Sequence, residues 1–157
     1  VSPVGYPADA SMRATLENGV KGSRRRKPFG TLFFSDGTLK PLSKDHPFRP
    51  YLEAVRSAPS ASNKQPWRFV VDNETFHLYL KRMVKPESKN FLDTQAIDAG
   101  IALSHLCLSL NEDGHETGFK RQSPMDISEW DYIVSVTMTP KTYDTPISNK
   151  DAKKGES

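Results

Sequence analysis

The residues best suited to chemistry lie in a short polar turn near the middle of the chain, Ala58–Trp67, which reads Ala-Pro-Ser-Ala-Ser-Asn-Lys-Gln-Pro-Trp. Its two prolines prevent a helix from continuing through it. The side chains of Ser60, Ser62, Asn63 and Gln65 offer hydrogen-bond donors and acceptors. This set could bind a planar polar ligand. The same residue types could also form no more than a capped connection between a helix and a strand.

A helix and a strand are expected on the two sides of this turn. Tyr51–Ser57 contains good helix formers with apolar residues at helical spacing, which predicts a helix from about Phe48 to Ser57. The β-branched and aromatic run Arg68–Val71 predicts a strand. We expect Trp67 to anchor that strand in the core, so that the turn joins a helix end to a strand start.

A second candidate for binding is the basic segment Ser23–Pro28, which contains three arginines and a lysine. Such a cluster could hold a phosphate through charge-assisted, partly bidentate hydrogen bonds. Its proline suits the first turn of a short helix, which we expect over Phe29–Phe34. A solvated loop or a nonspecific polyanion patch would explain the same charges.

The helix predicted over Asp93–Glu112 is apolar around most of its circumference, so we expect it to be buried or to lie at an interface. Gly114 is expected to end it. Phe76–Leu80 alternates as a half-buried strand would. The strand after the turn includes Phe69–Val71, and further strands are expected at Val1–Tyr6, His115–Gln122 and Asp131–Thr139. Loops are expected at Ala8–Gly22, on the surface, and at Met83–Asn90.

Length and composition indicate one soluble domain. At 157 residues the chain can form a single core, and the charged fraction of 26% with a hydrophobic fraction of 36% suits a globular protein. The net charge of +3 favours anionic ligands weakly and does not indicate nucleic acid. Cys107 is the only cysteine, which excludes an internal disulfide. No apolar run reaches the roughly 20 residues needed to span a membrane, and no secretory signal is visible, so we expect a cytoplasmic protein.

The remaining titratable residues do not form a catalytic set. His46, His77 and His115 lack the spacing of metal ligands, and His105 and Cys107 on the long helix are expected to pack in the core or at an interface. Nothing resembles a nucleophile with its base, a Walker phosphate loop or a zinc site. We therefore predict no catalytic and no metal-binding residue.

The string Pro59–Trp67 closely resembles the flavin-contacting segment of the FMN-dependent nitroreductase family. Two further motifs are similar to pieces of the same family. Gly5–Pro7 (Gly-Tyr-Pro), followed by Arg24–Pro28, looks like its phosphate-binding region, and Ile97–Leu106 is similar to its long central helix. The resemblance covers roughly residues 4–139.

The order of these motifs differs from that of an ordinary family member, because Gly-Tyr-Pro and the basic segment precede the turn and an Arg-x-Ser segment is absent. The order is similar to the C-terminal portion of a protein in which two family repeats are fused. Together with a start at Val1, it leads us to expect an incomplete nitroreductase-like domain over residues 1–140 and a disordered tail over 141–157. The partner would be a missing N-terminal repeat, forming an intrachain pseudo-dimer, or a second copy in a homodimer.

The resemblance implies an α+β fold with an antiparallel-rich sheet packed against a long buried central helix. It also implies an FMN-dependent oxidoreductase that passes a hydride from NAD(P)H to a small nitro- or quinone-like acceptor. The residues that it assigns to FMN are Arg24, Arg26 and Lys27 at the phosphate, Pro59, Ser60, Ala61, Ser62, Asn63 and Gln65 at the ring, and Gly118, whose backbone would approach the ring. A non-catalytic flavin-binding domain is the main alternative, and a polyanion-binding module is a weaker one, since no aromatic stacking platform accompanies the charge.

Overall fold

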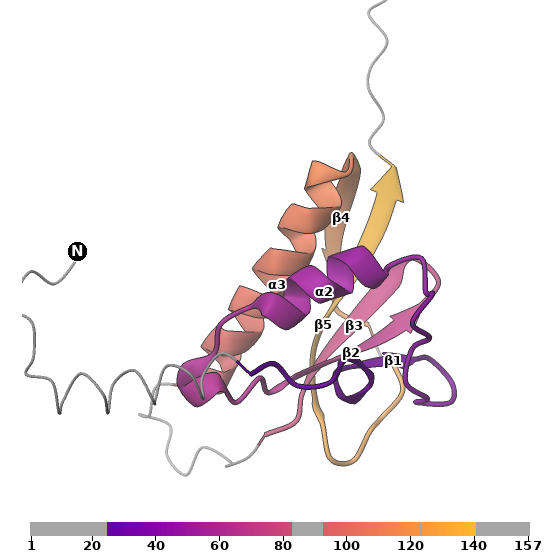
Figure 1. Ribbon diagram of the computed structural model, residues 1–157. Coiled ribbons are helices and arrows are strands. Elements are labelled where there is room, and N and C mark those ends of the chain that lie inside the picture. Colours follow the sequence, from indigo (N-terminus) through magenta and orange to yellow (C-terminus); the bar gives the residue numbers. More distant parts are fainter. Residues whose placement is uncertain (1–24, 83–92, 123, 141–157) are drawn as a thin grey trace, which may run out of the picture.

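The computed structural model describes residues 25–82, 93–122 and 124–140 of the chain (Figure 1). The expected strand Val1–Tyr6, Arg24, the two expected loops and the expected tail lie outside these residues. The elements are η1 (Phe29–Thr31), β1 (Phe33–Ser35), α2 (Arg49–Ser57), η2 (Ala61–Asn63), β2 (Trp67–Asp72), β3 (Thr75–Leu80), α3 (Thr94–Glu112), β4 (His115–Lys120) and β5 (Asp131–Pro140).

The strands form one five-stranded sheet in the order β1-β2-β3-β5-β4. β1 pairs with β2 in parallel, and the other three pairings are antiparallel. The two longer helices lie on one side of this sheet, with α2 crossing in front of α3 in Figure 1. The architecture is α+β with an antiparallel-rich sheet, as expected, and the helix and strands flanking the central turn lie where their periodicity predicts them.

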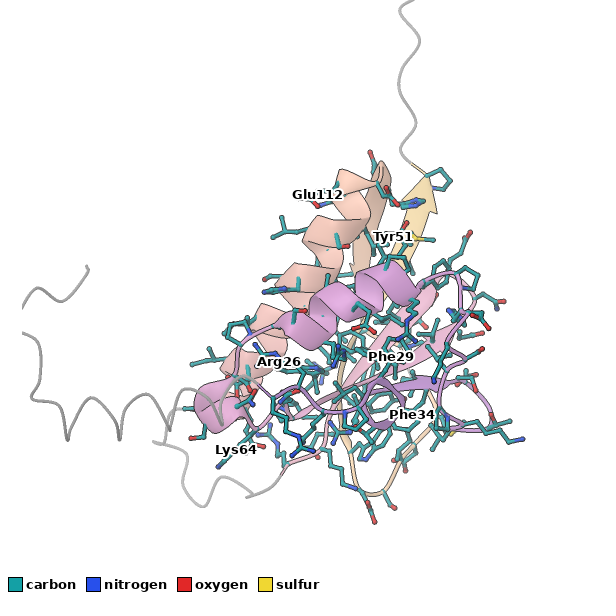
Figure 2. The ribbon with its side chains drawn as sticks, viewed as in Figure 1. Arg26, Phe29, Phe34, Tyr51, Lys64 and Glu112 are labelled. Atoms are coloured by element: carbon teal, nitrogen blue, oxygen red, sulfur yellow. The ribbon has the colours of Figure 1, made fainter. Side chains whose placement is uncertain are left out.

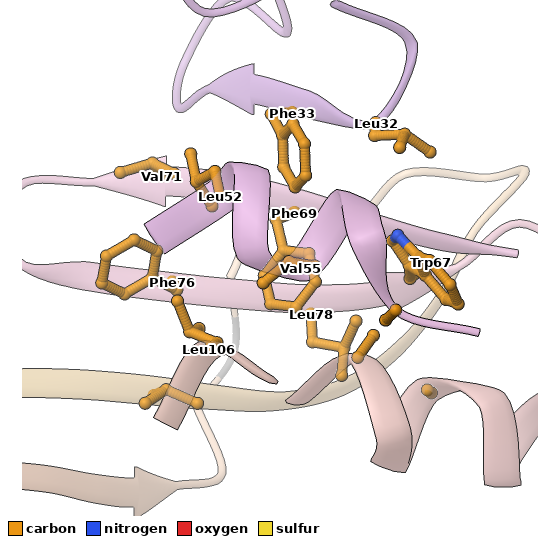
Figure 3. Packing of buried hydrophobic residues seen from close by; sticks show 14 of the residues in the cluster. Leu32, Phe33, Leu52, Val55, Trp67, Phe69, Val71, Phe76, Leu78 and Leu106 are labelled. Carbon is orange, nitrogen blue, oxygen red and sulfur yellow. The ribbon is translucent and has the colours of Figure 1, made fainter. Parts of the chain in front are cut away.

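The hydrophobic core fills the space between the sheet and the two helices (Figure 3). α2 contributes Leu52 and Val55, which are fully buried. Trp67 is also fully buried at the start of β2, which confirms its expected role as an anchor. The other members of the cluster from the sheet and from α3 are Phe33, Phe69, Val71, Phe76, Leu78, Leu80, Val136, Met138, Ala99, Ala102, Leu106 and Leu110.

The helix expected over Phe29–Phe34 forms only in its first half. A 3₁₀ turn covers Phe29–Thr31, and the chain then becomes the strand β1. The reason is long-range pairing, since Phe33 and Phe34 lie in parallel register with Phe69 and Val70 of β2. The hydrogen bonds and burial that this pairing provides outweigh the local preference for helix.

α3 is buried along one side, so its expected place in the core is confirmed for that side, and its expected place at an interface stays a prediction. Its buried residues are Asp98, Ala99, Ala102, Leu106 and Leu110. On the other side Ile97 is 49% and Leu108 is 62% exposed. The Asp93 side chain caps the helix by accepting from the Ala96 N–H at 3.1 Å, and Gly114 follows its end at a positive φ of 79°. Within the described ranges, no helix is long and apolar enough to cross a membrane.

β3 is buried on both faces, so the expectation of a half-buried strand was wrong. His77 and Tyr79 point away from the helices, yet they are only 4% and 1% exposed. The Trp130 ring packs against Tyr79, with ring centroids 5.9 Å apart, and covers this second face. There His77 Nδ1 lies 2.6 Å from the Ser135 hydroxyl, which lies 2.8 Å from the Tyr132 hydroxyl. The segment before β5, together with Tyr132 and Ser135 of β5, thus makes a second, partly polar layer.

Truncating a core leucine of α3 should destabilise the fold far more than truncating a surface leucine of the same helix. Leu106 is fully buried, whereas Leu108 is 62% exposed. We expect Leu106→Ala to lower the free energy of unfolding by about 3 kcal/mol. The matched change Leu108→Ala should cost no more than about 0.5 kcal/mol. Urea denaturation followed by circular dichroism measures both, and equal losses would contradict the one-sided burial of α3.

His77 should make stability depend on pH. Its burial lowers the pKa of the imidazole below its ordinary value of 6.5, an effect that Asp36 and Asp72 partly oppose. The unfolded state therefore binds the proton more readily, and stability is lost as pH falls below about 6.5. His77→Gln should remove up to about 1.4 kcal/mol per pH unit of this slope below roughly pH 6.5. Denaturant titrations across that range test this, and parallel profiles for both proteins would refute it.

Candidate functional site

The central turn is held in an unusual backbone conformation. Ser62, Asn63 and Gln65 have positive φ values of 50°, 52° and 45°, a region that favours glycine. For residues with a Cβ this geometry costs about 1–2 kcal/mol each, although Asn tolerates it better than most. Strained backbone of this kind persists only where its surroundings hold it, and it occurs often at binding sites. The contacts that hold the turn are therefore informative.

Gln65 is the centre of those contacts and is only 1% exposed. Its Oε1 accepts a hydrogen bond from the Lys27 N–H at 2.8 Å. Its Nε2 donates to Asn63 Oδ1 at 2.9 Å, to the Asn63 carbonyl at 3.1 Å and to the Arg25 carbonyl at 3.3 Å. Both ends of the buried amide are thus satisfied, as burial requires. Gln65 binds the turn to the basic segment.

Arg26 reinforces this connection. Its Nη1 donates to Asn63 Oδ1 at 2.7 Å, and its Nη2 donates to the Ser57 carbonyl at the end of α2 at 2.9 Å. Asn63 Nδ2 in turn donates to the Arg25 carbonyl at 2.7 Å. Figure 2 shows Arg26 at the same end of the molecule as Lys64 of the turn. We call residues 25–27 together with residues 60–65 the basic–turn unit.

Positive charge is concentrated beside this unit. The Lys27 Nζ lies 3.4 Å from the Gln65 carbonyl. Burial, together with the charges of Arg68 and Lys81, lowers the pKa of Lys27. Arg68 is 8% exposed and donates to the carbonyls of Gln65 and Trp67, and burial lowers its pKa as well. Cations that repel one another in partly buried positions would be stabilised by a bound anion.

The outer side of the turn is open to solvent. Ser60 Oγ accepts from the Gln65 N–H at 2.9 Å, and the Ala61 N–H donates to Asp98 Oδ1 of α3 at 2.9 Å. Pro59 and Ala61 are exposed, as is Ser62, whose hydroxyl has no partner within the described residues. The basic–turn unit is therefore closed on its inner side and offers polar groups on its outer side.

The predicted site residues are thus brought together in part. Lys27, Arg26 and the turn residues Pro59–Gln65 lie together, although they are far apart in the sequence. Arg24 lies outside the described residues. Gly118 lies on β4, at the sheet edge, with β3 and β5 between it and β2, so its assignment to the ring stays a prediction.

Sequence reasoning gave no role in the site to two residues that contact the turn, Asp98 and Arg68. Each is a charged residue inside a segment otherwise expected to be buried, and that mismatch was the available signal.

No cluster of three side chains suited to a metal ion occurs in the part of the chain that the structure describes. An open depression of about 990 Å³ lies at the opposite end of β2 and β3, lined by residues such as Lys40, His46, Phe48 and Thr75, and it shares no residue with the basic–turn unit.

Known proteins are similar to this chain in sequence and in fold. A family model described as "Putative TM nitroreductase" matches residues 1–110. A nitroreductase family protein from Clostridium difficile 630 superposes with a TM-score of 0.53 at 16% identity, covering 73% of this chain and 83% of that chain. A protein from Exiguobacterium sibiricum 255-15, described as a "putative nitroreductase in complex with FMN", superposes with a TM-score of 0.51 at 16% identity, covering 81% and 88%. No curated protein matches the chain. At these identities the two structures establish a shared fold.

Removing the Gln65 amide should weaken the fold at the basic–turn unit. Gln65→Leu roughly keeps the side chain's size but removes the acceptor of the partly buried Lys27 N–H and the donor to the Asn63 oxygens, so we expect a loss of about 2 kcal/mol in the free energy of unfolding. The neighbouring Lys64 is exposed, and Lys64→Met should change stability by less than about 0.5 kcal/mol. Thermal and urea unfolding measure both variants. Similar stabilities for the two would show that the amide contacts contribute little.

Proposed function

Because the chain belongs to the nitroreductase family whose model spans residues 1–110, we propose that the protein is an FMN-dependent oxidoreductase and that the basic–turn unit is part of its flavin site. The observation that carries this proposal is the joining of the basic segment to the turn through Gln65 and Asn63. The basic segment could bind an anion and the turn could bind a polar ring, and the two segments are held side by side in one unit.

The residues of the unit suit the chemistry of FMN. Its phosphate is a dianion, and Lys27, with Arg24 before it in the sequence, would supply the compensating charge. The edge of its ring carries alternating donors and acceptors, which the exposed hydroxyl of Ser62 and the backbone of the turn would meet. Arg26 and Asn63 are engaged with each other at 2.7 Å, so in this proposal they hold the unit together and contribute charge and dipole.

Bound FMN would supply the redox chemistry by taking a hydride from NAD(P)H and passing it to a small nitro- or quinone-like acceptor. The role of the chain is then to bind the cofactor, orient it and set the electrostatics around it. Lys27 and Arg68 place positive charge beside the turn, which would favour the reduced, more negative flavin. Because FMN would supply the redox chemistry, no side chain of the protein is required to act as an acid or a base. A second copy or a further repeat of the same fold would complete the site.

The full-length protein should bind FMN and turn over. We expect flavin absorbance bands in the purified protein, a higher melting temperature when FMN is added, and NAD(P)H oxidation with a nitroaromatic or quinone acceptor. Ser62→Ala should raise the Kd for FMN by about fivefold, as expected for the loss of one hydrogen bond. Ser128 is also an exposed serine, and Ser128→Ala should leave the Kd unchanged.

Three experimental outcomes distinguish the candidate functions. A colourless protein that gains no thermal stability with added FMN would contradict the cofactor assignment. FMN binding without NAD(P)H oxidation would show a non-catalytic flavin-binding domain. Steeply salt-dependent binding of nucleic acid, without FMN binding, would favour the polyanion-binding module.

A further inference from the structure

Asp98 is a charged residue buried beneath the central turn. It lies one turn into α3, between the turn and the core, and is only 3% exposed. Its Oδ1 accepts the Ala61 N–H at 2.9 Å. Its Oδ2 is also buried, and within the described residues it has no hydrogen-bond partner. Among the described residues the carboxylate thus makes one hydrogen bond, and its donor is the backbone of the turn.

The contact lies at the point where the backbone becomes strained. Ala61 directly precedes Ser62 and Asn63, the first two of the turn's residues with positive φ. Its N–H is oriented by Asp98, while Ser60 Oγ accepts from the Gln65 N–H on the other side of the turn. The strained segment is therefore held at both ends, from α3 on one side and from within the turn on the other.

A gain in folding stability does not explain why a carboxylate is buried at this position. In the part of the chain that the structure describes, Asp98 makes one hydrogen bond and no ion pair, and burying a carboxylate in that state costs free energy. What the side chain gives the turn is therefore the hydrogen-bond acceptor that it presents to the Ala61 N–H, a role that the amide oxygen of asparagine could also fill. The other charged groups of the site, Arg26 and Lys27, contact the far side of the turn, at Asn63 and Gln65.

We infer that Asp98 is a positioning residue of the flavin site, which sets the conformation of Ala61–Asn63 and thereby the affinity for flavin. This inference rests on the proposed function, since it names a residue that acts on the same site from beneath. Asp98 acts through Ala61 and does not touch the ligand. It links α3, which carries no predicted ligand of its own, to the outer surface of the turn.

The test compares three variants with the wild type for FMN affinity and for stability. Asp98→Ala removes the acceptor, and we expect the Kd for FMN to rise about tenfold, as for one lost hydrogen bond to a charged group. Asp98→Asn keeps an oxygen facing Ala61 and should rescue the affinity to within about threefold of the wild type. Glu112→Ala, an exposed change at the opposite end of α3 (Figure 2), should leave the Kd unchanged.

The outcomes are distinct from those of the proposed function. If the wild type does not bind FMN, the proposed function fails, and the inference fails with it. If the wild type binds and Asp98→Ala binds equally well, the inference alone is wrong. Equal weakening by Asp98→Ala and Asp98→Asn would also overturn it, because the charge and not the acceptor would then matter.

A direct probe covers the case in which Asp98→Ala does not fold. We expect the hydrogen bond to Asp98 to move the Ala61 amide proton to low field in the wild type, and Asp98→Asn should keep that chemical shift. In Asp98→Ser, whose shorter side chain does not reach Ala61, it should lose that shift. Unchanged shifts in both variants would contradict the inference.

Discussion

The structure of the candidate site depends on one buried side-chain amide, that of Gln65. A primary amide removed from water must have both its carbonyl and its N–H groups paired. Here the partners are backbone and side-chain groups of Lys27, Arg25 and Asn63. Burying Gln65 beside Trp67 at the start of β2 therefore fixes where the basic segment must run. The segment has no regular secondary structure at residues 25–27, so its place is determined by these contacts.

The rest of the fold brings supporting elements to the same place. The end of α2 supplies the Ser57 carbonyl to Arg26, β2 supplies the buried Arg68, and α3 supplies Asp98 to Ala61. Each element is fixed elsewhere by the hydrophobic core, so the turn is held between rigid parts. This arrangement explains how several residues can adopt positive φ at once. A site held by a second layer of contacts from regular elements is better ordered than a free loop.

Local patterns predicted most of the fold, and long-range contacts explain the parts that were missed. β-branched and aromatic residue types predicted β2, and periodicity located α2, α3 and β5 because their apolar residues repeat at the helical or strand period. It missed β1, because the strand Phe33–Ser35 is defined by pairing with β2. It also treated β3 as half-buried, because nothing near His77 and Tyr79 in the sequence indicates that Trp130 packs on Tyr79 or that Ser135 lies beside His77.

The candidate site was predictable in its residue types and not in its contacts. The turn and the basic segment were both identified, on grounds of composition and family resemblance. Their direct contact could not be predicted, because it joins residues 37 or more positions apart through side chains. The same contacts give Asn63 and Gln65 a role in holding the unit, where residue type alone suggested ligand binding. Asp98 was included only as a member of the helix motif Ile97–Leu106. A carboxylate that accepts a hydrogen bond from a backbone N–H far away in the sequence, here that of Ala61, leaves no local pattern.

Amide hydrogen exchange at Lys27 tests the central claim most directly. If the Gln65 amide holds the basic segment on the turn, the Lys27 N–H should exchange slowly, with protection closer to that of the β2 amides than to that of an unstructured peptide. The protection should disappear in Gln65→Leu while the β2 amides keep theirs. Exchange of the Lys27 amide at the rate of an unstructured peptide in the wild-type protein would contradict the account.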